Sequence, residues 1–323
     1  MIVEGDDETR PFVPGDRVLL LDSKGRRYLL SLKPGGEFHT HAGPVSHDDL
    51  LGQPEGVSVR STRGGRYIAV RPTLAEVILK MPRGAQVIYP KDLGPILIIA
   101  DVFPGARILE AGVGSGALSM TLLRAGASVV GYEIREDFAI RARANVVGFL
   151  GEGVLSRYQV QIRDVYDGID EHGLDRMILD LPEPWRVIKH AQTALRPGGI
   201  LLSYLPTIGQ VAQLREAIDH SALGMAETVE VLQRSWHIEG PSVRPDHRMV
   251  AHTGFLTSAR MLGGEGPRLV PPAGLLAGAD GADGADGADG ADGLGGAEGA
   301  DGVGGADGAG DGVGGVDGAG DGP

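Results

Sequence analysis

The stretch LDLPEPW, residues 179–185, places a carboxylate within an apolar run and follows it with two prolines and a tryptophan. One interpretation is a turn that ends a strand, because Asp is common in turns and Pro cannot continue a central strand. The other is a catalytic carboxylate, Asp180, held on a backbone that Pro182 and Pro184 make rigid. Such a group could move a proton or stabilise charge that develops during a reaction. This stretch alone does not choose between the two.

A glycine-rich turn, ILEAGVGSGALS at residues 108–119, is a second candidate for chemistry. Gly112, Gly114 and Gly116 follow an apolar run at G-x-G-x-G spacing, which is shorter than the dinucleotide-binding pattern G-x-G-x-x-G. Glycines at such a turn let the backbone pass close to a ligand and direct helix N–H groups toward it. A tight turn without a ligand would use the same residues, so the loop is weak evidence by itself.

Two further carboxylates strengthen the case for a bound nucleoside. Glu133 ends the run VVGYE, about twenty residues after the glycines, where a carboxylate can accept hydrogen bonds from both ribose hydroxyls. Asp164 ends the run YQVQIRD, where it can accept a hydrogen bond from an adenine amino group. The glycine loop, Glu133 and Asp164 on three successive strands together predict a cofactor that contains a nucleoside.

Alternating strands and helices would have to position these side chains. From residue 107 onward short apolar runs alternate with helical patterns, which predicts an α/β fold with a mainly parallel, seven-stranded sheet covered on both faces. In such sheets ligands bind at the carboxyl ends of the strands, where all the residues above fall. We expect strands at 107–110, 128–133, 158–162, 176–181 and 200–205, helices at 117–124, 135–149, 187–195 and 209–220, and two further β segments at about 226–235 and 249–262.

The residues before this region predict a small β-rich module. Two pairs of apolar runs, at 17–21 with 28–32 and at 57–60 with 67–70, flank turn residues and read as hairpins. Thr73-Leu74-Ala75-Glu76 then matches a capping box at the start of a helix. We therefore expect an N-terminal β domain at residues 1–72 and a larger domain at 73–265.

Residues 266–323 differ from both in composition. They are rich in Gly, Ala and Asp, and the GAD repeats resemble a calcium-binding β-helix only loosely, because their phase is broken. Such a segment has little to pack, so we expect it to be disordered. Of the 43 acidic residues in the chain, ten Asp and one Glu lie in 275–323, which leaves 32 against 30 Lys and Arg. The formal charge of −13 therefore says little about the folded part.

The chain has no cysteine, which excludes disulfides, thiolate zinc sites and a thiol nucleophile. No apolar stretch approaches 18 residues and the acidic N-terminus is unlike a signal peptide, so we expect a cytoplasmic protein without a membrane span. His39, His41 and His47 cluster without helical spacing or nearby carboxylates, and we expect them at the surface rather than at a metal site.

The motif E-x-G-x-G-S-G, followed by Y-E and R-D, resembles the class I S-adenosylmethionine (SAM) methyltransferases. SAM has no phosphate, which fits the shorter glycine loop. More closely, the chain resembles the tRNA (adenine-58-N1)-methyltransferases of the bacterial type over roughly residues 10–262. Four stretches carry this resemblance: RGAQVIYPKD (83–92), ILEAGVGSGALS (108–119), LDLPEPW (179–185) and RPDHRMVAHTGFL (244–256).

The resemblance implies a Rossmann-like class I fold, SAM as cofactor with S-adenosylhomocysteine as product, no metal, tRNA as partner and a homotetramer. It implies that Asp180 and Tyr89 are catalytic, with Asp180 hydrogen-bonded to the adenine N6 amino group and Tyr89 stacked on an extruded base. It places Tyr89, Lys91 and His252 at the substrate edge, with Lys91 meeting a phosphate and Asp92 capping the next helix. The implied cofactor-binding residues are Gly112, Gly114, Ser115, Gly116, Ala117, Leu118, Glu133, Asp164 and Asp180.

Two other functions stay open at this point. A SAM methyltransferase acting on protein isoaspartate or on a small molecule would share the glycine loop and Glu133, although DLPEPW and the N-terminal β module favour tRNA. A non-enzymatic RNA-binding protein with a relic cofactor fold is disfavoured by the intact Glu133, Asp164 and Asp180.

Overall fold

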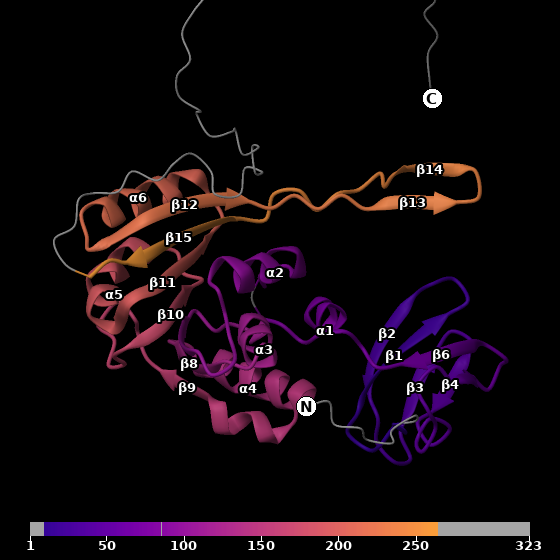
Figure 1. Ribbon diagram of the computed structural model, residues 1–323. Helices are drawn as coiled ribbons and strands as arrows, with labels where there is room; N and C mark the ends of the chain where they lie inside the picture. The colour runs from indigo at the N-terminus through magenta and orange to yellow at the C-terminus, as the bar shows by residue number, and fades with distance from the viewer. Residues whose placement is uncertain (1–9, 85, 264–323) are drawn as a thin grey trace, which may run out of the picture. The chain divides into compact units, whose positions relative to one another are not determined.

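The computed structural model describes residues 10–84 and 86–263 (Figure 1). The acidic tail expected from residue 266 onward lies outside the described residues. Within the described part of the chain, no helix is both long enough and apolar enough to cross a bilayer.

The N-terminal strands form a small antiparallel structure with a hydrophobic core of its own. Four of them pair in the order β2-β1-β6-β5, and β3 and β4 form a separate hairpin. Both predicted hairpins, β1–β2 and β5–β6, are confirmed. The β3–β4 hairpin had no sequence signal, because each of its strands carries a single large apolar residue, Phe38 or Val45. The strands are β1 Arg17–Asp22, β2 Arg27–Ser31, β3 Glu37–Thr40, β4 Gly43–Ser46, β5 Ser58–Arg60 and β6 Arg66–Val70.

The three clustered histidines differ in burial. His39 and His41 are exposed as expected, but the prediction for His47 is wrong, since only 4% of it is exposed. Its Nδ1 accepts a hydrogen bond from Lys33 N at 3.2 Å, and burial lowers the pKa of the ring. Among the described residues no group of three His, Cys, Asp or Glu side chains could hold a metal ion.

The helix predicted by the capping box is present as α1, Leu74–Lys80. Thr73 Oγ1 accepts a hydrogen bond from Glu76 N at 3.3 Å, and Glu76 Oε2 accepts one from Thr73 N at 2.9 Å. Because the two bonds satisfy backbone N–H groups that a helix start leaves free, the helix begins where the sequence predicts.

A seven-stranded sheet in the order β12-β15-β11-β10-β7-β8-β9 follows, so the predicted mainly parallel α/β fold is confirmed. Strand β15 is antiparallel to β11 and β12, and the other pairs are parallel. The strand order reverses between β7 and β10, where open α/β sheets bind ligands at the carboxyl ends. The strands are β7 Arg107–Ala111, β8 Ser128–Glu133, β9 Tyr158–Ile162, β10 Leu174–Leu179, β11 Leu195–Leu205, β12 Leu223–Glu230 and β15 Phe255–Met261.

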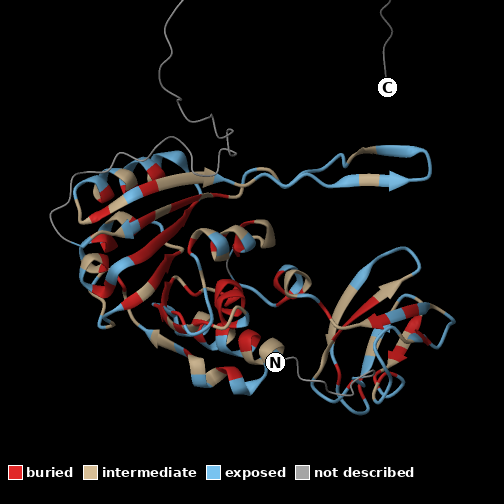
Figure 2. Ribbon diagram, in the orientation of Figure 1, coloured by how far each residue is buried: buried red, intermediate tan, exposed pale blue. Residues whose placement is uncertain are grey.

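Helices cover both faces of this sheet (Figure 1). Successive strand residues point to opposite faces, so Ile108 belongs to the core formed with α1 to α4, whereas Leu109 belongs to the core formed with α5 and α6. Figure 2 shows the buried central strands of the sheet in contrast to the exposed β13–β14 hairpin. The helices are α2 Pro90–Ile99, α3 Ala117–Arg124, α4 Glu136–Leu150, α5 Ile188–Ala194 and α6 Ile208–Asp219.

Several elements differ from the predicted boundaries: β12 ends at Glu230 rather than at about 235, β15 begins at Phe255 rather than at about 249, and β10 ends at Leu179 rather than at 181. Strand β11 begins at Leu195 and includes Pro197-Gly198-Gly199, which we expected to lie before the strand; a register irregularity in its pairing with β10 accommodates them. A short 3-10 turn, Pro184–Val187, precedes α5. The hairpin of β13, Trp236–Glu239, and β14, Ser242–Pro245, lies inside a connection without a helical or strand signal of its own.

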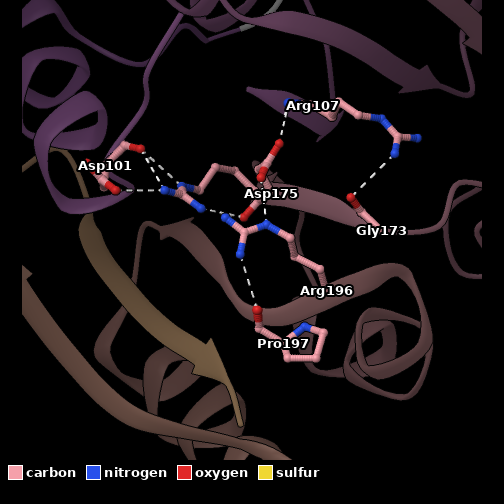
Figure 3. A network of polar contacts seen from close by, with 7 residues as sticks. Asp101, Arg107, Gly173, Asp175, Arg196 and Pro197 are labelled. Carbon is pink, nitrogen blue, oxygen red and sulfur yellow. Dashed lines mark hydrogen bonds and ion pairs between the residues drawn. The ribbon is translucent and has the colours of Figure 1, made fainter. Parts of the chain in front are cut away.

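A polar network fixes the amino ends of the central strands, at the edge of the sheet opposite the glycine loop (Figure 3). The buried Arg176 guanidinium donates hydrogen bonds to the backbone oxygen of Asp101 and to its Oδ2, both at 2.8 Å. Asp175 accepts hydrogen bonds from Arg107 N at 2.8 Å and from Arg196 Nε at 2.6 Å. The starts of β7, β10 and β11 are thereby held in register, which also fixes where these strands end.

Candidate active site

The glycine loop lies against the backbone of Asp180. Gly112, Gly114 and Gly116 have φ angles of +86°, +54° and +83°, a left-handed region that favours glycine. A Cβ on Gly112 would lie 3.0 Å from the carbonyl carbon of Asp180 and closer still to its oxygen. Asp180 N also donates a hydrogen bond to Ala111 O at 2.9 Å. The loop and Asp180 are therefore fixed relative to each other by backbone contacts.

The carboxylates predicted from the strand ends meet at the same edge of the sheet. Glu133 ends β8 and is 7% exposed; its Oε2 accepts a hydrogen bond from Gly114 N and its Oε1 accepts one from Arg135 N, both at 3.0 Å. Asp164 follows β9, and its Oδ1 accepts a hydrogen bond from Tyr166 N at 2.9 Å. Asp180 follows β10 directly, and within the described residues its side-chain oxygens accept no hydrogen bond. Its carboxylate is thus open to a ligand.

A cavity of about 420 Å³ opens over these residues. Gly112, Gly114, Glu133, Asp164 and Asp180 all line it. The other predicted loop residues, Ser115, Gly116, Ala117 and Leu118, are buried behind it. Its remaining wall is formed by Gln86, Tyr132, Ile134, Arg135, Phe138, Arg163, Val165, Tyr166, Leu181 and Pro182.

The pKa of Asp180 is raised to about 7, first by burial and then by the negative charge of Glu133. A carboxyl group in this range exchanges its proton near neutral pH, as a group that assists proton movement should. A cation bound in the cavity would lower this pKa and favour the carboxylate. The charge of Asp180 near neutral pH therefore depends on whether a cation is bound beside it.

A second buried carboxyl group, Glu110, stands behind the glycine loop on β7. Burial raises its pKa to about 8, and the charges of Asp180 and Glu133 act in the same direction. Ser119 Oγ donates a hydrogen bond to Glu110 Oε2 at 2.6 Å, and Tyr158 Oη donates one to Ser119 Oγ at 3.1 Å. The sequence analysis gave Glu110 no role. Its position as the first residue of the glycine motif could have indicated that it lies next to the loop.

The residues predicted at the substrate edge lie outside the lining of this cavity. Tyr89 is half-buried and extended at the N-cap of α2, as the following proline predicts. Tyr204, which the sequence did not indicate, donates a hydrogen bond from its Oη to Thr253 O at 2.5 Å. Burial raises the pKa of Tyr204 to about 12, and the negative charges of Asp92 and Asp180 and the hydroxyl of Tyr89 act in the same direction.

Lys91, Asp92 and His252 each have a polar partner within the protein. The Lys91 side chain is 3% exposed and its Nζ lies 2.8 Å from Asp92 Oδ1, so a phosphate contact has no support here. Asp92 lies inside the first turn of α2, whose N-cap is Tyr89, so the predicted cap is wrong. His252 is exposed; its Nδ1 lies 2.6 Å from Glu230 Oε1, which raises its pKa.

The strand order, the antiparallel strand β15 and the carboxylates over a glycine loop define a class I methyltransferase fold. Comparison with known proteins narrows this class. The family model described as tRNA methyltransferase complex GCD14 subunit matches residues 67–244, more than half of the chain. A model described as TrmI-like N-terminal matches residues 11–59.

Individual relatives agree with these models. The tRNA (adenine(58)-N(1))-methyltransferase TrmI of Thermus thermophilus is 38% identical over 246 residues, which cover 75% of this chain and 96% of that protein. The crystal structure of the tRNA (m1A58) methyltransferase TrmI of Aquifex aeolicus is 31% identical with a TM-score of 0.68, covering 78% of this chain and 99% of that one. A Thermotoga maritima structure described as a SAM-dependent O-methyltransferase is 33% identical with a TM-score of 0.75, covering 79% and 96%. The chain belongs to the tRNA (adenine-58-N1)-methyltransferase family, so the resemblance is confirmed.

Proposed function

We propose that this protein transfers the methyl group of SAM to N1 of adenine 58 in the T-loop of tRNA, giving 1-methyladenosine and S-adenosylhomocysteine. The observation that carries the proposal is the position of Asp180: its backbone contacts the glycine loop while its carboxylate lines the cavity beside Glu133. Family membership supplies the tRNA substrate class.

The cavity fits SAM. Its volume of about 420 Å³ lies in the usual range for small-ligand sites. We assign the ribose hydroxyls to Glu133 and the adenine amino group to Asp164, because both carboxylates line the cavity and can accept more hydrogen bonds than the backbone gives them. SAM supplies an activated methyl group on a sulfonium cation, and that positive charge beside Asp180 would lower its raised pKa and favour the carboxylate.

In this proposal Asp180 acts on the substrate adenine. Its carboxylate accepts a hydrogen bond from the N6 amino group and stabilises the positive charge that N1 gains on methylation. Backbone contacts with Ala111 and Gly112 hold Asp180 in place, which matters because methyl transfer needs an in-line approach over a short distance. Tyr89 supplies a face on which the extruded base stacks, and His252 remains at the edge of this surface.

The substrate class is tested by incubating the protein with methyl-labelled SAM and separate pools of tRNA, protein and metabolites. Label confined to tRNA supports the proposal. Label in protein or metabolites would instead support isoaspartate or small-molecule methylation.

We also propose that the enzyme works in the cytoplasm as a homotetramer. Register pairs place Trp236, Ile238 and Val243 on one face of the β13–β14 hairpin, and they are 57%, 73% and 62% exposed. An isolated two-stranded hairpin is marginally stable in water, so an apolar face of this kind gains from being covered by another copy of the chain. Light scattering of the wild type and of Ile238→Asp tests whether this face joins copies of the chain. A wild-type tetramer together with a smaller assembly of the variant supports the proposal, and a wild-type monomer refutes it.

We further propose that residues 1–72 and 73–265 are separate domains. Among the described residues, the hydrophobic core of the N-terminal domain is formed by residues from Phe12 to Ala69. The hydrophobic cores around the seven-stranded sheet begin at Leu74. This division supports a boundary at the capping box of α1.

A further inference from the structure

Two charged side chains in the first turn of α2 are buried although neither lines the cavity. Asp92 is 0% exposed, and the Lys91 side chain is 3% exposed. Removing an ion pair from water is expensive, and apolar side chains of similar size often stabilise a fold as well or better. Stability alone is therefore a weak explanation of this pair, and its other contacts indicate what it holds in place.

The pair attaches α2 to both ends of a single connection. Lys91 Nζ donates a hydrogen bond to Val231 O at 2.6 Å, and Val231 directly follows β12. Asp92 Oδ2 accepts a hydrogen bond from Thr253 Oγ1 at 2.7 Å, and Thr253 lies just before β15. The connection between them, residues 231–254, carries the β13–β14 hairpin. We call Lys91, Asp92 and Thr253 the α2 clasp.

The same connection is tied to the substrate side of the cavity. Tyr204 Oη donates a hydrogen bond to Thr253 O at 2.5 Å, and Tyr204 lies on β11, the strand next to β10, which Asp180 follows. His252 Nε2 lies 2.8 Å from Pro206 O, just after β11. The ends of the connection are therefore held both to the first turn of α2 and to the end of β11.

Tyr89 depends on the clasp for its position. It is the N-cap of α2 but makes no side-chain capping bond. Its backbone oxygen accepts hydrogen bonds from Asp92 N at 2.9 Å and Leu93 N at 3.1 Å. The place where the first turn is attached thus sets the place of Tyr89.

We propose that Lys91, Asp92 and Thr253 are positioning residues for methyl transfer: they attach the first turn of α2 to the ends of the 231–254 connection and thereby hold Tyr89, the N-cap of that turn, in place. The role of Tyr89 in this statement rests on the proposed function, whereas the attachment of α2 does not.

The attachment is tested by hydrogen–deuterium exchange of a peptide covering residues 87–97. Thr253→Val keeps the side-chain shape but removes the hydroxyl, and Thr253→Ser keeps the hydroxyl. Thr193→Val, at an exposed threonine of α5, is the matched control. We expect exchange to rise about tenfold in Thr253→Val alone, since a hydrogen bond to a charged group is lost. Wild-type exchange in Thr253→Val would overturn the proposal, whatever the enzyme methylates.

The action through Tyr89 is tested by a double-mutant cycle on kcat for tRNA. Thr253→Val should lower kcat about tenfold in the wild-type background, with SAM affinity unchanged, and should have no further effect in a Tyr89→Ala background. Effects that multiply in the double variant would show that the clasp does not act through Tyr89 and would overturn the proposal. A wild-type enzyme that forms no 1-methyladenosine would refute the proposed function, while the exchange result would still decide the attachment.

Discussion

The substitution Gly112→Ala should separate the geometry of the glycine loop from its chemistry, since it adds one methyl group and no charge. Gly112 has a φ of +86°, and its Cβ would lie 3.0 Å from the carbonyl carbon of Asp180. Carbon atoms in contact are about 3.5–4.0 Å apart, so the loop or Asp180 must move by roughly 0.5–1 Å. The left-handed backbone adds about 1–2 kcal/mol of strain for an alanine.

A shift of this size at Asp180 should reduce activity more than stability. A misplacement of about 1 Å in a catalytic constellation can lower the rate about a hundredfold. We therefore expect kcat for tRNA methylation to fall by about two orders of magnitude, SAM affinity to fall, and the free energy of unfolding to fall by roughly 1–3 kcal/mol. Steady-state kinetics, calorimetry with SAM and urea unfolding measure the three effects.

Two other glycines provide matched controls. Gly114 shares the left-handed backbone, with φ of +54°, but a methyl group added there would have no neighbour within 4 Å among the described residues. Gly209 has neither a close neighbour of this kind nor a left-handed backbone. Gly209→Ala should behave as wild type, and Gly114→Ala should show the loss of stability without the displacement of Asp180. A Gly112→Ala enzyme with wild-type kcat and SAM affinity would refute the reasoning about the loop.

The other predictions concern the carboxylates. Glu133→Ala should raise the Kd for SAM about 10–100-fold with the fold intact, because a hydrogen bond to a charged group is worth about 1.5–3 kcal/mol; unchanged affinity in calorimetry would remove Glu133 from the site. Asp180→Asn should lower kcat far more than tRNA affinity. Near-normal turnover at saturating SAM and tRNA would instead show that Asp180 only forms the turn that ends a strand. Because the pKa of Asp180 is raised to about 7, wild-type kcat/KM for SAM should rise between pH 6 and pH 8 as the carboxylate forms, and Asp180→Asn should lose this rise. The folded state holds the proton more tightly than the unfolded state, so stability falls as pH rises from about 4 to 7, and Asp180→Asn should raise the Tm more at pH 8 than at pH 5.

Much of the parallel sheet could be predicted because each strand is a short apolar run bounded by a turn. Helix α3 and strands β8 and β9 have the predicted bounds. Glu133, Asp164 and Asp180 line one cavity because parallel strands bring their carboxyl ends to one edge, so their positions in the chain predicted that they would lie together.

Other features depend on contacts between distant segments and leave little local pattern. Tyr204 and Thr253 lie 49 residues apart, and Thr253 and Asp92 lie 161 apart, yet these pairs are hydrogen-bonded. Lys91 was expected to meet a phosphate, and only the fold shows that its Nζ reaches Val231 O. The burial of His47 was not predicted either, because its contact with Lys33 N leaves no pattern in the local sequence.

Mass spectrometry of nucleosides from tRNA decides whether this protein methylates adenine 58. An unmodified tRNA transcript and a second transcript with guanine at position 58 are each incubated with the full chain and SAM. We expect about one 1-methyladenosine per molecule in the first transcript, none in the second, and a large loss with Asp180→Asn. Methylation of both transcripts, formation of a different methylated nucleoside, or full activity of Asp180→Asn would contradict the proposed function or the role of Asp180 in it.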